Sequence, residues 1–133
     1  TAAQQEGLLE KGDPVQGIVR ITRHPFLWGT ALWAAAHLSV NGDRASILLF
    51  SGVLLVALAG TVSIDRKRAR KLGPSWQSFV ARTSNLPFAA ILRGRNHLAL
   101  AEIGIAKPAL ALLIFAVVIG LHPILFHASP LPW

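Results

Sequence analysis

Cysteine and methionine are both absent from this chain of 133 residues. Without cysteine, disulfides, zinc–thiolate sites and thiol nucleophiles are excluded together. Without a methionine at residue 1, we expect the chain to be the later part of a longer protein, with one or more helices before it. Charge is scarce as well, because only 14% of the residues are charged, against about 25% in a soluble domain.

Long apolar runs take the place of the missing charge. Hydrophobic residues make up 53% of the chain, and residues 45–64 and 108–126 each match the roughly 17–25 residues that a helix needs to cross a bilayer. A shorter run begins at Pro25, a residue suited to a first helical turn, and ends near residue 40 before a turn signal at 41–44. The sequence predicts one all-α membrane domain over residues 1–133, a polytopic helical bundle with three transmembrane helices in this chain and further helices upstream.

Basic residues gather beside these runs rather than inside them. The net charge is +7, and five basic residues follow the run 45–64 directly: Arg66, Lys67, Arg68, Arg70 and Lys71. Basic loops of this kind lie on the cytoplasmic side of a membrane. We therefore expect the lipid bilayer as the main partner, together with other membrane protein subunits, and no nucleic acid.

The segment after the basic cluster, residues 65–96, is predicted to be amphipathic. Leu72, Trp76 and Phe79 fall at helical spacing, which is typical of a helix that lies in the headgroup region. Trp76 and Trp133 are expected to anchor the chain at the interface between lipid and water.

Two histidines stand inside the apolar runs. His37 lies in the first run and His122 in the last, and a titratable ring at membrane depth is expensive to bury without a partner. Two imidazoles that face each other in a helical bundle can hold a haem iron from both sides, whereas no carboxylate falls within the runs to favour zinc or di-iron. His37 and His122 are therefore candidate metal ligands, and the alternative of hydrogen-bonded packing residues stays open for both.

A second group of polar residues lies at the basic ends of the runs. It comprises Arg23 and His24, then Asp65 and Arg66, then residues 82–84. Arginine side chains beside a helix amino terminus suit a phosphate or a carboxylate, so Arg23 and His24 are candidate cofactor-binding residues. We expect His24 to meet solvent or an anionic headgroup, and headgroup binding alone is the alternative for the whole group.

Five segments, in this order, resemble the NnrU family of bacterial membrane proteins. They are ITRHPFLWG at 21–29, LWAAAHL at 32–38, NGD at 41–43, RTSNLPFAAI at 82–91 and LHPILF at 121–126. The resemblance implies a multi-pass protein of the bacterial cytoplasmic (inner) membrane with a role in nitrogen-oxide metabolism during denitrification.

The NnrU family is in turn similar to the 15-cis-zeta-carotene isomerases, which use haem b. That similarity implies that His37 is an axial haem ligand, and that carotenoid cis–trans isomerisation is an alternative role. The isomerases carry a cysteine three residues before this histidine, where the present chain has Ala34. The similarity leaves open whether the chain is an enzyme.

Arg23, His24 and the segment LGPSWQSF at 72–79 carry a fainter similarity to membrane methyltransferases of the isoprenylcysteine and phospholipid type. It implies an alternative in which Arg23 and His24 bind S-adenosylmethionine. A non-catalytic subunit of a larger membrane complex is the third alternative.

Overall fold

The computed structural model describes residues 13–130, and every regular element among them is helical. The chain divides into two compact units, residues 1–99 and 100–133. The first unit contains the 3₁₀ helix η1 (Gly17–Arg20) and the helices α2 (Pro25–Val40), α3 (Arg44–Leu72), α4 (Pro74–Arg82) and α5 (Ala89–Leu92). The second contains α6 (Leu100–Ile103) and α7 (Ala106–Phe126).

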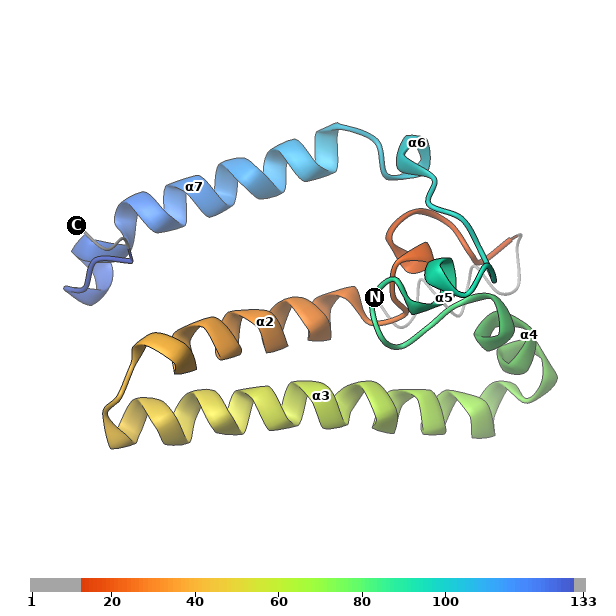
Figure 1. The fold of residues 1–133 in the computed structure, drawn as a ribbon, viewed down its shortest axis with the longest axis horizontal. Helices are drawn as coiled ribbons and strands as arrows, with labels where there is room; N and C mark the ends of the chain where they lie inside the picture. The colour runs from red at the N-terminus through yellow and green to blue at the C-terminus, as the bar shows by residue number, and fades with distance from the viewer. Residues whose placement is uncertain (1–12, 131–133) are drawn as a thin grey trace. The chain divides into compact units, whose positions relative to one another are not determined.

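The first unit is built on an antiparallel hairpin of α2 and α3, which lie side by side (Figure 1). Helix α2 begins at Pro25 as predicted. Proline suits the first helical position because it lacks a backbone N–H, and an N–H at that position would have no partner within the helix. Only residues 41–43 link the two helices, and the Asp43 side chain accepts a hydrogen bond of 2.9 Å from the backbone N–H of Ser46. This cap fixes the start of α3.

Small residues bring the two helices together. Ala31, Ala34 and Ala57 are buried at 3%, 0% and 2% exposure. A Cβ atom added at Gly60 would lie 3.4 Å from a methyl carbon of Leu27. Small side chains allow close backbone approach, which is how helices associate in membranes where lipid is as apolar as leucine.

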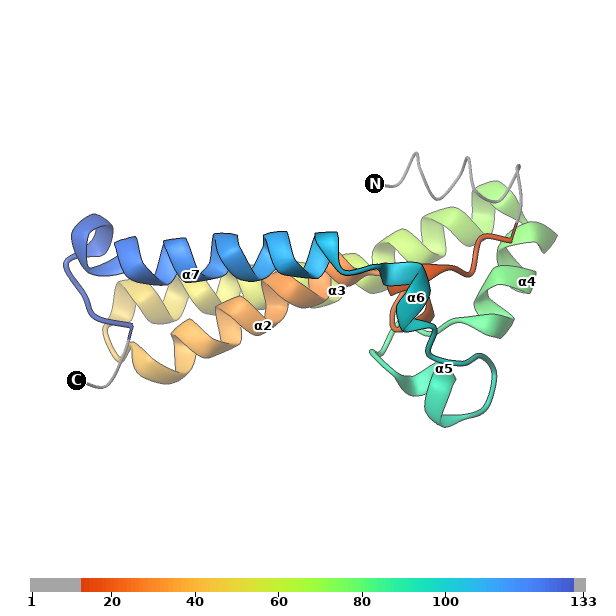
Figure 2. The ribbon, with the colours of Figure 1, turned by 90° about the horizontal axis from the view of Figure 1, so that it is seen from above.

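A small apolar core lies at the end of the hairpin opposite the 41–43 link. We call this end of the hairpin the basic end. Val15 and Val19 pack with Trp76 and Phe79, and the guanidinium of Arg68 lies 5.4 Å from the Trp76 ring centre. Figures 1 and 2 show α4 at this end of α3. The expectation of an interfacial anchor was wrong for Trp76, which is 3% exposed, because the segment before α2 supplies the apolar partner that its face needs. Trp133 lies outside the described residues.

Within residues 13–130, two helices are long and apolar enough to cross a membrane by length and composition, where the sequence predicted three. They are α3 and α7, with mean hydropathy of 2.4 and 2.6 over their most apolar stretch. Helix α2 has 16 residues, or about 24 Å at 1.5 Å per residue, and the hydrocarbon core is about 30 Å thick. Its apolar run is ended early by the turn residues at 41–43.

Replacing Ala34 by leucine is expected to destabilise the hairpin. The added methyl groups have no room between α2 and α3, and overpacking of this kind costs about 1–3 kcal/mol. The matched control is Ala35→Leu, since Ala35 is the exposed neighbour on the same helix. Thermal unfolding in mild detergent should show a lower Tm for A34L alone, and equal shifts for both variants would contradict the packing described.

Candidate functional site

Asp65 joins two side chains at the basic end of the hairpin. Its carboxylate accepts hydrogen bonds from Arg23 Nη2 at 2.6 Å and Arg23 Nε at 3.3 Å, and it lies 2.7 Å from His24 Nε2. Arg23 and His24 are 7% and 5% exposed, and the Asp65 side chain is 19% exposed. We call these three residues the Asp65 cluster. Burial strengthens such charge-assisted hydrogen bonds because water no longer competes for them.

The local sequence explains why these groups meet. His24 is the N-cap of α2, so Arg23 and His24 precede the helix and their side chains can reach back across the hairpin. Asp65 follows the apolar run 45–64 on α3. Because the helices are antiparallel and joined by a short link, the start of α2 lies beside the later half of α3.

A third segment, residues 83–85, closes over the cluster. Arg23 Nη1 donates to Thr83 Oγ1 at 3.3 Å, and the backbone N–H of Arg23 donates to Ser84 O at 3.0 Å. Thr22 Oγ1 donates to Asn85 O at 2.6 Å. Thr83 and Ser84 are buried. Thr22 and Arg23 are thus hydrogen-bonded, through side chains and through the Arg23 backbone, to a segment about sixty residues away in the chain.

Two further residues extend this network, and sequence reasoning missed both. Trp28 Nε1 donates to Asn85 O at 2.8 Å, and Asn85 Nδ2 donates to Thr61 Oγ1 at 2.9 Å. Trp28 lies in the segment 21–29 and Asn85 in the segment 82–91. Both segments are among those that carry the resemblance to the NnrU family, and this was the signal in the sequence that could have pointed to the two residues. They link α2, α3 and the segment after α4.

The structure corrects the expectation for His24 and divides the predicted polar group. His24 does not meet solvent, because the ring is turned towards Asp65 and is buried. Arg66 and Arg82 stay outside the cluster: Arg66 is exposed, and Arg82 forms an ion pair of 2.8 Å with Asp13. The hydrogen bonds from the Arg82 side chain and the Val15 backbone lower the pKa of Asp13. Cofactor binding by Arg23 and His24 stays a prediction.

His37 lies near the other end of α2, among aromatic rings. Its Nδ1 lies 2.9 Å from Trp33 O, and its ring centre lies 4.6 Å from Trp33 and 4.9 Å from Phe50. A carbonyl only accepts hydrogen bonds, so Nδ1 carries the proton and the lone pair of the neutral ring is on Nε2. Histidines that bind metals hold their other ring nitrogen in this way.

His122 shows the same arrangement within the second unit. Its Nδ1 lies 2.8 Å from Ala128 O, and its ring centre lies 4.9 Å from that of Phe126. Over residues 13–130 no group of three or more histidines and acidic residues could hold a metal ion, and axial haem ligation requires only one or two imidazoles. The roles of His37 and His122 as metal ligands remain predictions.

Asp65→Asn is expected to lower the stability of the first unit strongly. It removes the negative charge beside a buried guanidinium, and breaking a buried pair in this way costs about 3–5 kcal/mol. The matched control is Asp13→Asn, whose pair with Arg82 is about half exposed and so contributes at most about 1 kcal/mol. Thermal unfolding measures the Tm of both variants. A decrease in Tm for D65N no larger than that for D13N would contradict the conclusion that the Asp65 cluster is buried and stabilising.

Among the described residues, two helices have the length and composition needed to cross a membrane, and the Asp65 cluster lies just beyond the apolar run of one of them, α3. The family described as NnrU protein matches residues 2–130, and the chain belongs to this family. It is similar to the chloroplastic 15-cis-zeta-carotene isomerase of Arabidopsis thaliana, at 39% identity over 82 residues, and to that of Zea mays, at 37% over 82 residues. Each match covers 62% of this chain and 22% of the relative, so it spans about a fifth of the relatives' length. No solved structure matches.

Proposed function

We propose that this chain forms the haem-binding part of an NnrU-family membrane protein that isomerises a carotenoid, with His37 as an axial ligand of haem b. The geometry of His37 is the observation that carries the proposal, because its Nδ1 proton is directed to the Trp33 carbonyl. The similarity to proteins named 15-cis-zeta-carotene isomerase supports the choice of reaction. A role in nitrogen-oxide metabolism rests on the resemblance to the family and stays a prediction.

The residues around His37 fit a haem ligand. The hydrogen bond to Trp33 O fixes the orientation of the imidazole, as partners of metal-bound histidines do. Trp33 and Phe50 contact the ring and limit its rotation. When bound, a haem iron supplies redox and coordination chemistry at this position. His122 is the second candidate ligand, and the test below treats it separately.

The surface of α2 suits a hydrocarbon substrate. A shallow hollow on this helix is lined by Pro25, Phe26, Gly29, Thr30 and Trp33. Phe26 is 81% exposed and Trp33 is 49% exposed, which in lipid gives apolar contact to a polyene. Trp33 lies one helical turn before His37, so a chain held in this hollow would extend towards the imidazole.

We propose further that α2 lies in the bilayer beside α3, with the basic end on the cytoplasmic side of a bacterial inner membrane. Basic residues at one end of α3 support this orientation. The Asp65 cluster then lies at the inner boundary of the hydrocarbon, where the partly buried carboxylate satisfies the buried Arg23 and His24 side chains. The short α2 leaves its last turn, which contains His37, close to the outer boundary.

His37→Ala is expected to remove or strongly reduce the Soret absorbance of the full-length protein purified in mild detergent. Loss of an axial ligand lowers haem retention and changes the sharp α and β bands of the dithionite-reduced spectrum. The control is His97→Ala, because His97 is exposed in a loop of the same unit. An unchanged spectrum in H37A would exclude His37 as a ligand, and H122A tests the second candidate in the same way.

Isomerase activity is a separate test. The haem-loaded protein is incubated with 15-cis-zeta-carotene in detergent micelles, and the isomers are separated by liquid chromatography. We expect conversion that H37A abolishes and H97A retains. Haem retention without conversion would contradict the proposed reaction while leaving the haem site in place.

A further inference from the structure

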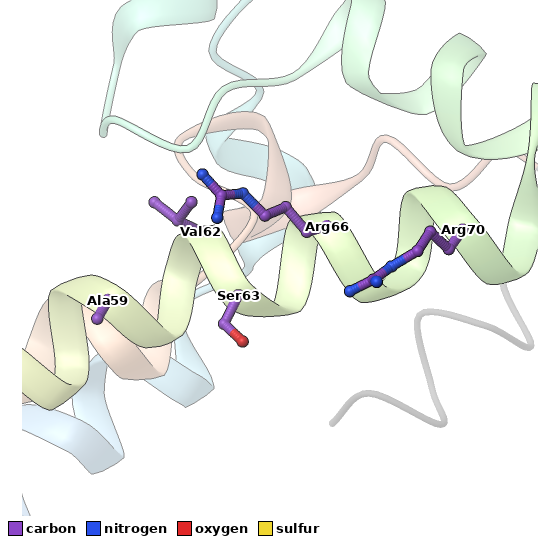
Figure 3. Close-up of a pocket in the computed structure, with 5 residues that line it drawn as sticks. All are labelled: Ala59, Val62, Ser63, Arg66 and Arg70. Carbon is purple, nitrogen blue, oxygen red and sulfur yellow. The ribbon is translucent and has the colours of Figure 1, made fainter.

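A hollow on α3 faces away from α2 and combines apolar with basic residues. Among the described residues it is lined by Ala59, Val62, Ser63, Arg66 and Arg70. Figure 3 shows these side chains along one helix, with the guanidinium of Arg66 beside Val62 and the Arg70 side chain further along the helix. All five are exposed in the first unit. We infer that this hollow binds one phospholipid with an anionic headgroup.

The spacing of the five residues gives α3 two different faces. At about 100° per residue, positions 59, 62, 63, 66 and 70 fall within about a third of the helix circumference. The buried residues Ala57, Thr61 and Arg68 lie on the opposite side, where Gly60 approaches Leu27 of α2. The hollow is therefore not part of the hairpin interface.

The positive charges of Arg66 and Arg70 favour the binding of an anion in this hollow. Arg66 and Arg70 are four residues apart, so their side chains are neighbours on the helix. Over residues 13–130 neither forms an ion pair with a carboxylate, whereas Arg23 and Arg82 both do. Two guanidinium groups and the Ser63 hydroxyl supply several N–H and O–H donors, which are the donor types that bind a phosphate.

The apolar end of the hollow selects a lipid over a soluble phosphate. Ala59 and Val62 lie within the uncharged run 45–64, and Arg66 follows just after it. From Ala59 to Arg70 is eleven residues, or about 16 Å along the helix axis. A phosphate beside the arginines would place the acyl chains along Val62 and Ala59, in the direction of the hydrocarbon. A free phosphate would gain nothing from that end.

The test is lipid binding by the full-length protein in mild detergent, measured by native mass spectrometry with dioleoyl phosphatidylglycerol and dioleoyl phosphatidylcholine. We expect one phosphatidylglycerol to bind in preference to phosphatidylcholine. The double variant R66Q/R70Q should weaken that binding by roughly tenfold or more, because each arginine near an anionic headgroup contributes appreciably. The matched control R44Q/K67Q loses the same charge from exposed positions outside the hollow and should bind within about twofold of the wild type.

Two further arms separate the alternatives. Ala59→Phe fills the apolar end without changing charge and should weaken phosphatidylglycerol binding, while thermal unfolding checks that the variant is folded. Inorganic phosphate should not displace the lipid. Displacement by phosphate, or equal losses in R66Q/R70Q and R44Q/K67Q, would overturn the assignment.

Discussion

The carboxylate of Asp65 is the group on which the rest of the first unit depends. Removing a carboxylate and a guanidinium from water is expensive, and the arrangement is tolerated only where the hydrogen-bonding geometry is good. Here the carboxylate contacts Arg23 twice and His24 once. These contacts hold the start of α2 against α3, and Arg23 in turn bonds the segment after α4 through Thr83 and Ser84.

The two ends of the hairpin differ in their chemistry. The basic end contains the buried polar network and the apolar core around Trp76. The opposite end contains His37 among aromatic rings. His24 and His37 are thirteen residues apart, so about 20 Å of helix separates them. They cannot serve one small site, and the proposed haem ligand is therefore independent of the Asp65 cluster.

The helices could be predicted from the sequence because their signals are local. Pro25 marked the start of α2, and the uncharged run 45–64 marked most of α3. The burial of Trp76 could not be predicted in this way, because it depends on packing against Val15 and Val19, which lie far away in the chain. The sequence grouped Arg23, His24 and Asp65 by their position at the ends of the runs. It did not show that these three side chains are hydrogen-bonded to one another, since only the antiparallel packing of α2 and α3 brings Asp65 to Arg23 and His24.

Whether Arg23 and Asp65 act as one buried unit is tested most directly by a double-mutant cycle. The variants R23Q, D65N and R23Q/D65N are compared by thermal or chemical unfolding of the full-length protein in mild detergent. The buried geometry predicts a coupling free energy of about 1–3 kcal/mol, so the double variant loses clearly less stability than the sum of the single variants. Additive losses, within about 0.5 kcal/mol, would contradict a hairpin held together by the Asp65 cluster.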